Sequence, residues 1–264
     1  MYDFLLYALA GASVGFVVGM TGVGGGSLMT PILLAFGFTP TVAIGTDLLY
    51  AAITKAGGVI AHARQSTVNW KIVRNLLLGS LPASVVTMAL LKHLHTRGID
   101  YSPILTTTLG VMLILTSLVL FFRTFLLHER DYLASGKSAL AEFEHQHATL
   151  LTIVTGISLG ALVTLSSVGA GAFGAAVLMV LYPRLPMIQV IGTDLAHAVP
   201  LTAVAGLGHL HLGNVDFNLL AGLLLGSLPA IWLGTKAANR MPEKIMQRLV
   251  AFILIGLGVN YTFF

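Results

Sequence analysis

Cysteine is absent from this sequence and charged side chains are scarce, at 9% of 264 residues. The absence of cysteine excludes disulfides, thiolate metal ligands and cysteine nucleophiles. An ordinary soluble domain carries about 25% charged residues, which keep its surface in contact with water. So few charges cannot cover such a surface, and the composition therefore excludes an ordinary soluble domain.

Signatures of nucleotide binding, zinc proteases and nucleic-acid binding are also missing. Gly22–Gly26 is rich in glycine, but the Lys-Ser or Lys-Thr pair of a phosphate-binding loop does not follow it. A His-Glu-x-x-His motif does not occur. The net charge of +4 is small, and no basic stripe is interleaved with aromatic residues, so we expect no nucleic-acid partner. We expect neither an enzyme nor a cofactor, and active transport would have to draw on an ion gradient or on the substrate's own gradient.

Long apolar segments fill most of the chain, in which hydrophobic residues make up 56%. Each is close to the roughly 20 residues that a helix needs to cross the hydrocarbon core of a membrane. The N-terminal segment contains Asp3 and no positive region before it, which predicts a retained first helix and not a signal peptide. The pattern predicts an all-α integral membrane protein in contact with membrane lipid. The segments are 4–20, 40–61, 75–91, 102–122, 149–168, 187–208, 217–235 and 246–264.

Two motifs occur twice in the same register. Gly45–Leu48 reads Gly-Thr-Asp-Leu and recurs as Gly192–Leu195, 147 positions later. Leu76–Ala83 reads Leu-Leu-Leu-Gly-Ser-Leu-Pro-Ala and recurs as Leu223–Ala230 with the same offset of 147. An internal repeat in an apolar chain is typical of membrane transporters, whose substrate sites form where the two halves meet.

The duplication divides the chain into two repeats and a linker. We expect a first transmembrane repeat over residues 1–127, a polar linker over 128–147 and a second repeat over 148–264. Each repeat should contain about four full transmembrane helices and one half-helix that follows a glycine break. With four crossings per half, the repeats should run parallel and be related by an axis along the membrane normal.

The two glycine breaks are candidates for the substrate site. They lie at Gly22–Gly26 and Gly169–Gly174, and the apolar segment after each is too short to span a bilayer. A half-helix that begins there would present free N–H groups and the positive end of its dipole, which together attract an anion. The alternative is that the glycines only permit close helix crossing. The glycines expected to bind substrate are Gly24, Gly25, Gly26 and Gly171.

The motifs in combination resemble the sulfite exporter TauE/SafE family of membrane permeases. The residues that carry the resemblance are Gly22–Pro31, Pro40–Thr46, Val68-Asn69 and Gly79–Ala83, repeated as Ile191–Thr193, Val215-Asp216 and Gly226–Ala230. The resemblance covers the chain apart from the linker. It implies a permease that moves small anions, typically sulfite, sulfonates or sulfoacetate, across the bacterial inner membrane. Family members usually have a small hydroxyl residue after Gly-Thr, where this chain has Asp47 and Asp194.

A polar stripe runs down one face of the helix expected over 40–61. Asp47, Lys55 and His62 are separated by 8 and 7 residues, which at 3.6 residues per turn places them on one face. Charges at membrane depth are costly and usually face a cavity or each other. The second copy carries Asp194, Thr202 and His209 at the equivalent positions.

Each residue of the stripe has a structural and a functional interpretation. Asp47 and Asp194 either cap helix N-termini or take up and release a coupling proton. Lys55, which the second half lacks, either extends toward the interface, attracts the substrate anion or forms an internal ion pair. His62 and His209 either close helix ends or relay protons. Thr46 and Thr193, beside the aspartates, are expected to contact substrate.

Three functions follow in order of preference. The first is a secondary permease for small anions, in which one repeat rocks against the other. The second is a transporter of protons or divalent metal cations that uses the aspartates and histidines. The third is a membrane assembly subunit that transports nothing. Three His-x-His pairs lack a further local ligand, so we expect no metal site, and the sequence leaves a homodimer open.

Overall fold

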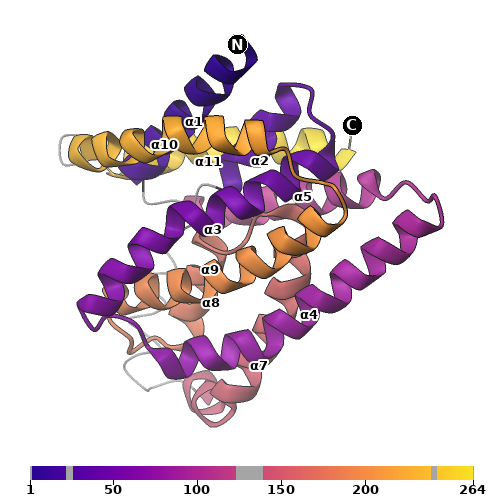
Figure 1. The fold of residues 1–264 in the computed structure, drawn as a ribbon. Helices are drawn as coiled ribbons and strands as arrows, with labels where there is room; N and C mark the ends of the chain where they lie inside the picture. Colours follow the sequence, from indigo (N-terminus) through magenta and orange to yellow (C-terminus); the bar gives the residue numbers. More distant parts are fainter. Residues whose placement is uncertain (1, 22–25, 123–138, 239–242, 264) are drawn as a thin grey trace.

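The computed structural model describes residues 2–21, 26–122, 139–238 and 243–263, and these residues form helices joined by short turns (Figure 1). No strand occurs in these ranges, which confirms the prediction of an all-α protein. In chain order the helices are α1 (Tyr2–Thr21), α2 (Gly26–Ala35), α3 (Pro40–Arg64), α4 (Trp70–Thr96), α5 (Ser102–Phe121), α7 (Ala139–Ser166), α8 (Ala172–Leu181), α9 (Met187–His211), α10 (Phe217–Ala238) and α11 (Glu243–Phe263).

Proline and glycine mark the helix ends. Pro40 opens α3 and Pro103 lies in the first turn of α5, where a missing N–H costs nothing. Gly37, Gly98 and Gly213 follow α2, α4 and α9 with φ of 85°, 69° and 75°. These are left-handed backbone angles that glycine adopts without a steric penalty, so each glycine stops its helix.

Several helices are long and apolar enough to cross a membrane. Within the part of the chain that the structure describes, five qualify by length and hydropathy: α4, α5, Ala148–Ser166 of α7, α9, and Phe217–Ala237 of α10. Large apolar side chains such as Trp70, Leu225 and Phe252 are exposed on the surface, as expected where lipid replaces water. The chain is a multi-pass membrane protein.

The helices of the two halves follow the same order, and their first residues keep the offset of the duplicated motifs. α3 starts at Pro40 and α9 at Met187, while α4 starts at Trp70 and α10 at Phe217, so both offsets are 147. α3 and α9 are each 25 residues long. α2 and α8 are each 10 residues long and are the short segments expected after the glycine breaks.

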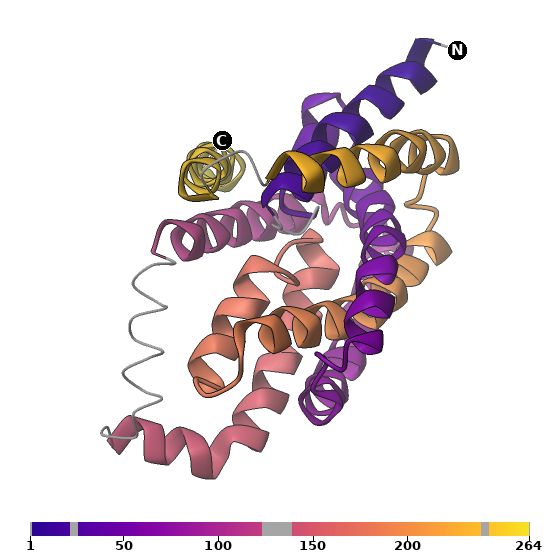
Figure 2. The same ribbon diagram turned by 90° about the vertical axis from the view of Figure 1, so that its left-hand side faces the viewer.

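The most extensive helix contacts join one half to the other. α1 packs on α10, α7 on α4, α3 on α9 and α5 on α11. In both ribbon views α1, α10 and α11 lie at the top and α7 at the bottom, with α3 and α9 between them (Figures 1 and 2). The two repeats are therefore separate in the sequence but not in space, because the first helix of each repeat, α1 or α7, packs against a helix of the other repeat.

Glycines allow the α1–α10 pair to approach at backbone distance. A β-carbon on Gly11, Gly15 or Gly19 would collide with the main chain of Leu223, Ser227 or Ile231, respectively. The contacts advance by four residues on both helices, so α1 and α10 run in the same direction. Small residues at this spacing allow membrane helices to pack closely. The glycines of α1 therefore serve close helix packing.

The same packing occurs between α7 and α4. Gly156 lies against Leu76, and Gly160 against Ser80. Residues 156–160 read Gly-Ile-Ser-Leu-Gly, which has the letters of a hydrolase nucleophile motif. They lie inside a continuous helix, however, and the Ser158 hydroxyl donates to Val154 O of the same helix at 3.2 Å. The strand-to-helix turn that such a motif requires is absent from this segment.

Helix directions overturn the expectation of parallel repeats. Gly45, near the start of α3, lies against His209 and Asn214 at the end of α9, whereas Gly192, near the start of α9, lies against His62 and Thr67. α3 and α9 are thus antiparallel. α5 and α11 are antiparallel as well, since a β-carbon on Gly110 would meet Gly258 and Thr262 while Ser117 Oγ donates to Ala251 O at 2.8 Å.

A two-fold axis along the membrane normal would leave equivalent spanning helices parallel. The antiparallel pairs require an axis in the membrane plane, so the halves are inverted and not parallel. The expectation failed because it came from a count of apolar segments. Because a chain reverses direction with each crossing, antiparallel equivalent helices mean an odd number of crossings per repeat and not the four that were counted.

We expect Gly15→Val to lower the apparent melting temperature in detergent by about 3–10 °C, because the added side chain forces α1 away from Ser227 of α10. Gly256→Val is the matched control, since a β-carbon at Gly256 meets nothing within 4 Å. Equal melting temperatures for the two variants in a thermal unfolding scan would contradict close α1–α10 packing.

Candidate functional site

Three charged side chains are buried where α3 crosses α9. Asp47 is 0% exposed, Lys55 9% and Asp194 4%. Gly206 of α9 lies against Leu49, and Gly58 of α3 lies against Leu195. The two aspartates therefore lie toward opposite ends of this contact, and Lys55 lies between them. The charges of Asp194 and Asp47 both act on the Lys55 ammonium, that of Asp194 more strongly.

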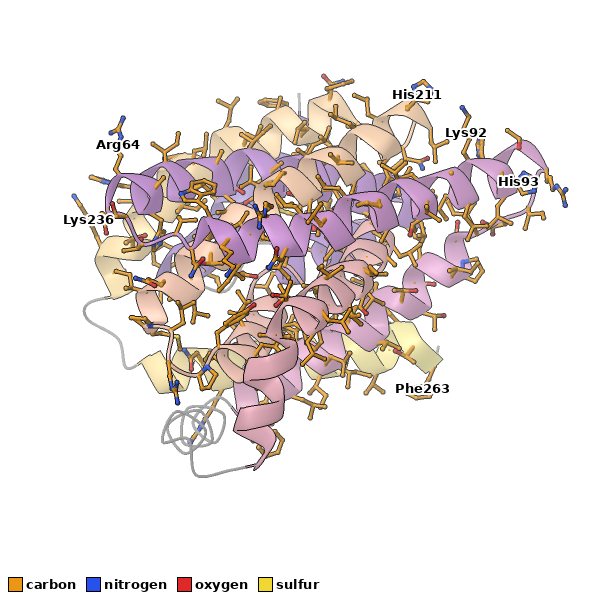
Figure 3. All side chains as sticks on the ribbon, turned by 90° about the horizontal axis from the view of Figure 1, so that it is seen from below. Arg64, Lys92, His93, His211, Lys236 and Phe263 are labelled. Carbon is orange, nitrogen blue, oxygen red and sulfur yellow. The ribbon has the colours of Figure 1, made fainter. Side chains whose placement is uncertain are left out.

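Several other basic side chains lie at the ends of the molecule. Arg64 and Lys236 lie at one end, and Lys92, His93 and His211 at the other (Figure 3). This is the distribution expected of a chain whose helix ends reach the two membrane surfaces. Lys55, in the interior, is the exception that the site must explain.

The second glycine break is an irregular segment between α7 and α8. α7 ends at Ser166 and α8 begins at Ala172, which confirms a break at the predicted place. Ser167, Gly169 and Gly171 have φ of 59°, 123° and 148°. Gly169 and Gly171 tolerate such angles because they lack a β-carbon, whereas Ser167 does not and is held by its surroundings.

This break touches all three buried charges within eight residues. Lys55 Nζ donates to Ala170 O at 2.7 Å. The hydroxyl of Ser167 lies near the Asp47 carboxylate without forming a hydrogen bond of good geometry. A β-carbon on Gly174, in the first turn of α8, would collide with Asp194 Oδ1.

The two aspartates contact the two short helices. Asp47 Oδ2 accepts a hydrogen bond from Thr30 Oγ1 of α2 at 2.5 Å, and its Oδ1 is buried without a partner. Asp194 lies against the first turn of α8, where its negative charge complements the helix dipole. The position of Asp194 provides no side-chain cap for α8, so capping stays a prediction for both aspartates. A substrate anion at the α8 N-terminus would nevertheless meet a carboxylate already in place.

Thr46 and Thr193 bind backbone in the other half. Thr46 Oγ1 accepts from the Asp216 N–H at 3.1 Å, and Thr193 Oγ1 accepts from the Asn69 N–H at 3.0 Å. Asn69 and Asp216 in turn accept from N–H groups in the first turns of α4 and α10, at 3.3 and 3.0 Å. The two hydroxyls therefore fix the starts of α4 and α10, and direct contact with substrate stays a prediction.

Sequence reasoning missed a pair of polar contacts between the halves. His197 Nε2 lies 2.9 Å from Ser80 Oγ. The equivalent residues, 147 positions away, are Tyr50 and Ser227, which lie beside each other and are both buried. The signal was available in the duplicated Gly-Ser-Leu-Pro-Ala motif, since its serine is the one polar side chain in an apolar stretch.

His62 and His209 lie far from the aspartate of their own helix but beside the aspartate-bearing end of the other helix: Gly192 lies against His62 and Gly45 against His209. Each is fifteen residues from the aspartate of its helix, which is about 22 Å along the helix axis. His62 Nδ1 lies 2.8 Å from Thr67 Oγ1, and His209 Nε2 lies 3.0 Å from Thr164 O. Because α3 and α9 are antiparallel, the two histidines lie at opposite ends of the pair. A role for them in proton relay stays a prediction.

The remaining predicted residues lie at the glycine breaks. Gly24 and Gly25 are outside the described residues, and Gly26 is the first residue of α2. Gly171 directly precedes α8 and accepts from the Ala175 N–H at 2.8 Å. Among the described residues, no three His, Asp or Glu side chains converge to hold a metal ion.

The family profile described as sulfite exporter TauE/SafE matches residues 7–261, nearly the whole chain. The chain belongs to this family. This confirms the resemblance seen in the glycine breaks and the Gly-Thr and Gly-Ser-Leu-Pro-Ala motifs. Family membership makes this TauE/SafE protein a membrane permease and not an enzyme.

Relatives of this TauE/SafE protein are similar over their full lengths. The probable membrane transporter protein YjnA of Bacillus subtilis is 36% identical over 252 residues, which are 96% of this chain and 97% of the relative. YdhB of the same organism, also named a probable membrane transporter protein, is 26% identical over 90% of this chain and 91% of its own. MJ0441 of Methanocaldococcus jannaschii carries the same description and is 25% identical, over 98% of this chain and 96% of its own. No solved structure shows significant similarity.

Removing the Thr193 hydroxyl should loosen the start of α4. In Thr193→Val the Asn69 N–H loses its acceptor, at a cost of about 1–3 kcal/mol, or roughly 2–10 °C in melting temperature. Thr235→Val is the control, because that exposed hydroxyl only donates to Ile231 O of its own helix. If both valine variants have the melting temperature of the wild type in a thermal scan, the hydrogen bond between Asn69 and Thr193 is dispensable for stability.

Proposed function

We propose that the protein is a secondary permease that moves a small sulfur-containing anion, such as sulfite, a sulfonate or sulfoacetate, across the bacterial inner membrane with proton coupling. The observation that carries this proposal is the single buried lysine between two buried carboxylates at the interface of the halves. The family's name supports the substrate class.

The charge of this site sets the condition for binding an anion. With Lys55 protonated and both aspartates ionised the site carries −1, and each proton taken up by an aspartate adds one unit. A buried site of net −1 repels an anion, because Coulomb energies at low dielectric constant are several kcal/mol at contact distances. Protonation of Asp47 and Asp194 raises the charge to +1 and lets the anion bind. Anion and proton binding then favour each other by the same free energy, as linkage requires.

Lys55 has donors available for the substrate. An ammonium group has three N–H donors, and one of them is directed at Ala170 O. Protonation of Asp194 also removes the negative charge that now faces the first turn of α8, so the free N–H groups there become available to an anion. The glycine break and Lys55 would thus hold the substrate from two sides, on elements of opposite halves.

Alternating access follows from the inverted arrangement. Two inverted halves can exchange conformations, so that an entrance on one membrane face is replaced by its counterpart on the other. The contacts of the charged residues already differ between halves: Lys55 binds the second break, and its equivalent Thr202 donates to Ala198 O of its own helix at 2.9 Å. Repeats 1–127 and 148–264 would be the units that exchange.

Replacing Lys55 tests the substrate role. In Lys55→Met we expect anion flux into proteoliposomes to fall about 10–100-fold, since a hydrogen bond to a charged group contributes about 1.5–3 kcal/mol. Thr202→Val at the equivalent position of the second half serves as the control and should transport normally. Flux would be measured for sulfite, sulfoacetate and methanesulfonate; unchanged flux in Lys55→Met removes this residue from the site, and the absence of flux for every anion in the wild type favours the non-transporting subunit.

The coupling role of the aspartates has a separate test. In Asp47→Asn and Asp194→Asn the substituted side chain is uncharged at every pH, as a protonated aspartate is. Anion flux should therefore persist and become much less dependent on an imposed pH gradient. Wild-type flux should rise severalfold when the gradient drives protons in the direction of the anion. Asparagine variants that respond to the gradient as the wild type does would place proton coupling elsewhere.

A further inference from the structure

An open groove of about 650 Å³ lies between α3, α4 and α9. Its walls are largely apolar: Val59 comes from α3, Leu78 and Pro82 from α4, and Pro200 from α9. α4 and α9 are both long and apolar enough to span a membrane, and Leu78 is 59% exposed, so the groove opens toward lipid. The hydrocarbon chain of a lipid is therefore the occupant that fits these walls.

Among the described residues, Arg74 is the one charged side chain that lines the groove. It is exposed, and it forms no ion pair or hydrogen bond within the part of the chain that the structure describes. Trp70 lies one turn before it, at the start of α4, and is 59% exposed. Exposed tryptophans gather at the level of the lipid headgroups. A guanidinium at this level can bind a phosphate through two parallel N–H donors.

The spacing along α4 matches the depth of one lipid leaflet. Pro82 lies eight residues after Arg74, which is about 12 Å along the helix axis. One leaflet contributes about 15 Å of hydrocarbon, half of the core of roughly 30 Å. An acyl chain that follows the groove from Arg74 to Pro82 therefore stays within a single leaflet.

The membrane face around Arg74 is basic. Arg64 ends α3 at one end of the molecule (Figure 3), and Lys71 and Arg74 lie in the first two turns of α4, which follows it in the chain. All three side chains are exposed. Clusters of this kind attract anionic lipid headgroups. The acidic side chains that the structure describes are buried or lie at the opposite end, and they are Asp47, Asp194, Asp100 and Asp216.

The second half lacks the basic residues of this groove. The positions 147 residues after Lys71 and Arg74 are Asn218 and Ala221. Because the halves are inverted, α10 starts at the opposite membrane face from α4. The duplicated helices thus carry an arginine for a headgroup on one membrane face only.

We propose that the groove between α3, α4 and α9 binds an anionic phospholipid, with the headgroup phosphate on Arg74 and one acyl chain along the apolar walls toward Pro82. The lipid contacts α4 of the first half and α9 of the second. The site is separate from the buried charges, so this inference does not depend on the proposed anion permease, and its test needs no transport.

Trp70 reports on the site, because it lines the groove and the chain has only 2 tryptophans. The full-length Trp232→Phe variant, in phosphatidylcholine vesicles, leaves Trp70 as the single fluorophore. Phospholipids brominated on an acyl chain quench a tryptophan beside which they bind. We expect brominated phosphatidylglycerol to bind beside Trp70 about fivefold more strongly than brominated phosphatidylcholine, which corresponds to about 1 kcal/mol for one basic residue at the membrane surface. Equal binding of the two lipids would rule out the site.

Matched variants separate the groove from the general charge of this membrane face. In the same background, Arg74→Ala introduces the residue that the second half has and should remove the preference for phosphatidylglycerol. Lys71→Ala deletes a neighbouring exposed charge that does not line the groove and should keep most of the preference.

Quenching by brominated phosphatidylcholine shows that each variant is inserted, and Arg74→Gln replaces Arg74→Ala if the latter is not. An equal loss in the Lys71 and Arg74 variants would assign the preference to surface charge alone. An unchanged preference in the Arg74 variant would place the lipid elsewhere. Either result overturns the site.

Discussion

Irregular backbone in a membrane interior has to find hydrogen-bond partners within the protein, and the rest of this structure depends on how the second glycine break meets that condition. The chain leaves helical geometry at Ser167 and returns to it at Ala172. The carbonyl of Ala170, which has no helical partner, accepts a hydrogen bond from Lys55 Nζ of the other half. The break is thereby attached to α3, and the buried charges are held around it. A lysine is costly in this environment, and the carbonyl and two carboxylates make it tolerable.

Hydrogen bonds between the two halves connect the buried charged residues to the arrangement of the helices. Thr46 and Thr193 each accept a hydrogen bond from the residue just before α10 or α4 in the opposite half, and Ser80 lies within hydrogen-bond distance of His197. Every one of these bonds crosses between sequence halves. A movement of α3 relative to α9 therefore changes the positions of α4 and α10 and the geometry around the charges together. Such coupling between a site and its supporting helices is what alternating access requires.

The long apolar segments predicted the helical class, the glycine breaks predicted the short helices after them, and the polar stripe with its repeat drew attention to Asp47, Lys55 and Asp194, which are buried. Because the copies share an offset, even the first residues of α9 and α10 could be located from those of α3 and α4. The inverted relation was missed because it depends on whether each repeat crosses the membrane an odd or an even number of times, and the apolar segments were counted as four crossings per repeat. The duplicated motif marked Ser227 as a polar side chain, but its partner Tyr50 could not be identified, because the two residues belong to opposite halves and are 177 positions apart. A shared helix face leaves each histidine four turns from the aspartate of its own helix, and the sequence did not show that the antiparallel contact sets it against the glycine before the other half's aspartate.

The exchange of first helices has a consequence for how the protein is made. α1 ends at Thr21, whereas its partner α10 begins at Phe217, so roughly 200 residues separate the two surfaces that must meet. At about 5–20 residues per second, α1 emerges some 10–40 s before α10 exists. During that interval the stripe of Gly11, Gly15 and Gly19 faces lipid or an insertion chaperone and not its final partner. The α1–α10 contact, which joins the two halves, can therefore close only late in biosynthesis, and of the four main contacts between the halves only the α5–α11 contact has to wait for a later helix.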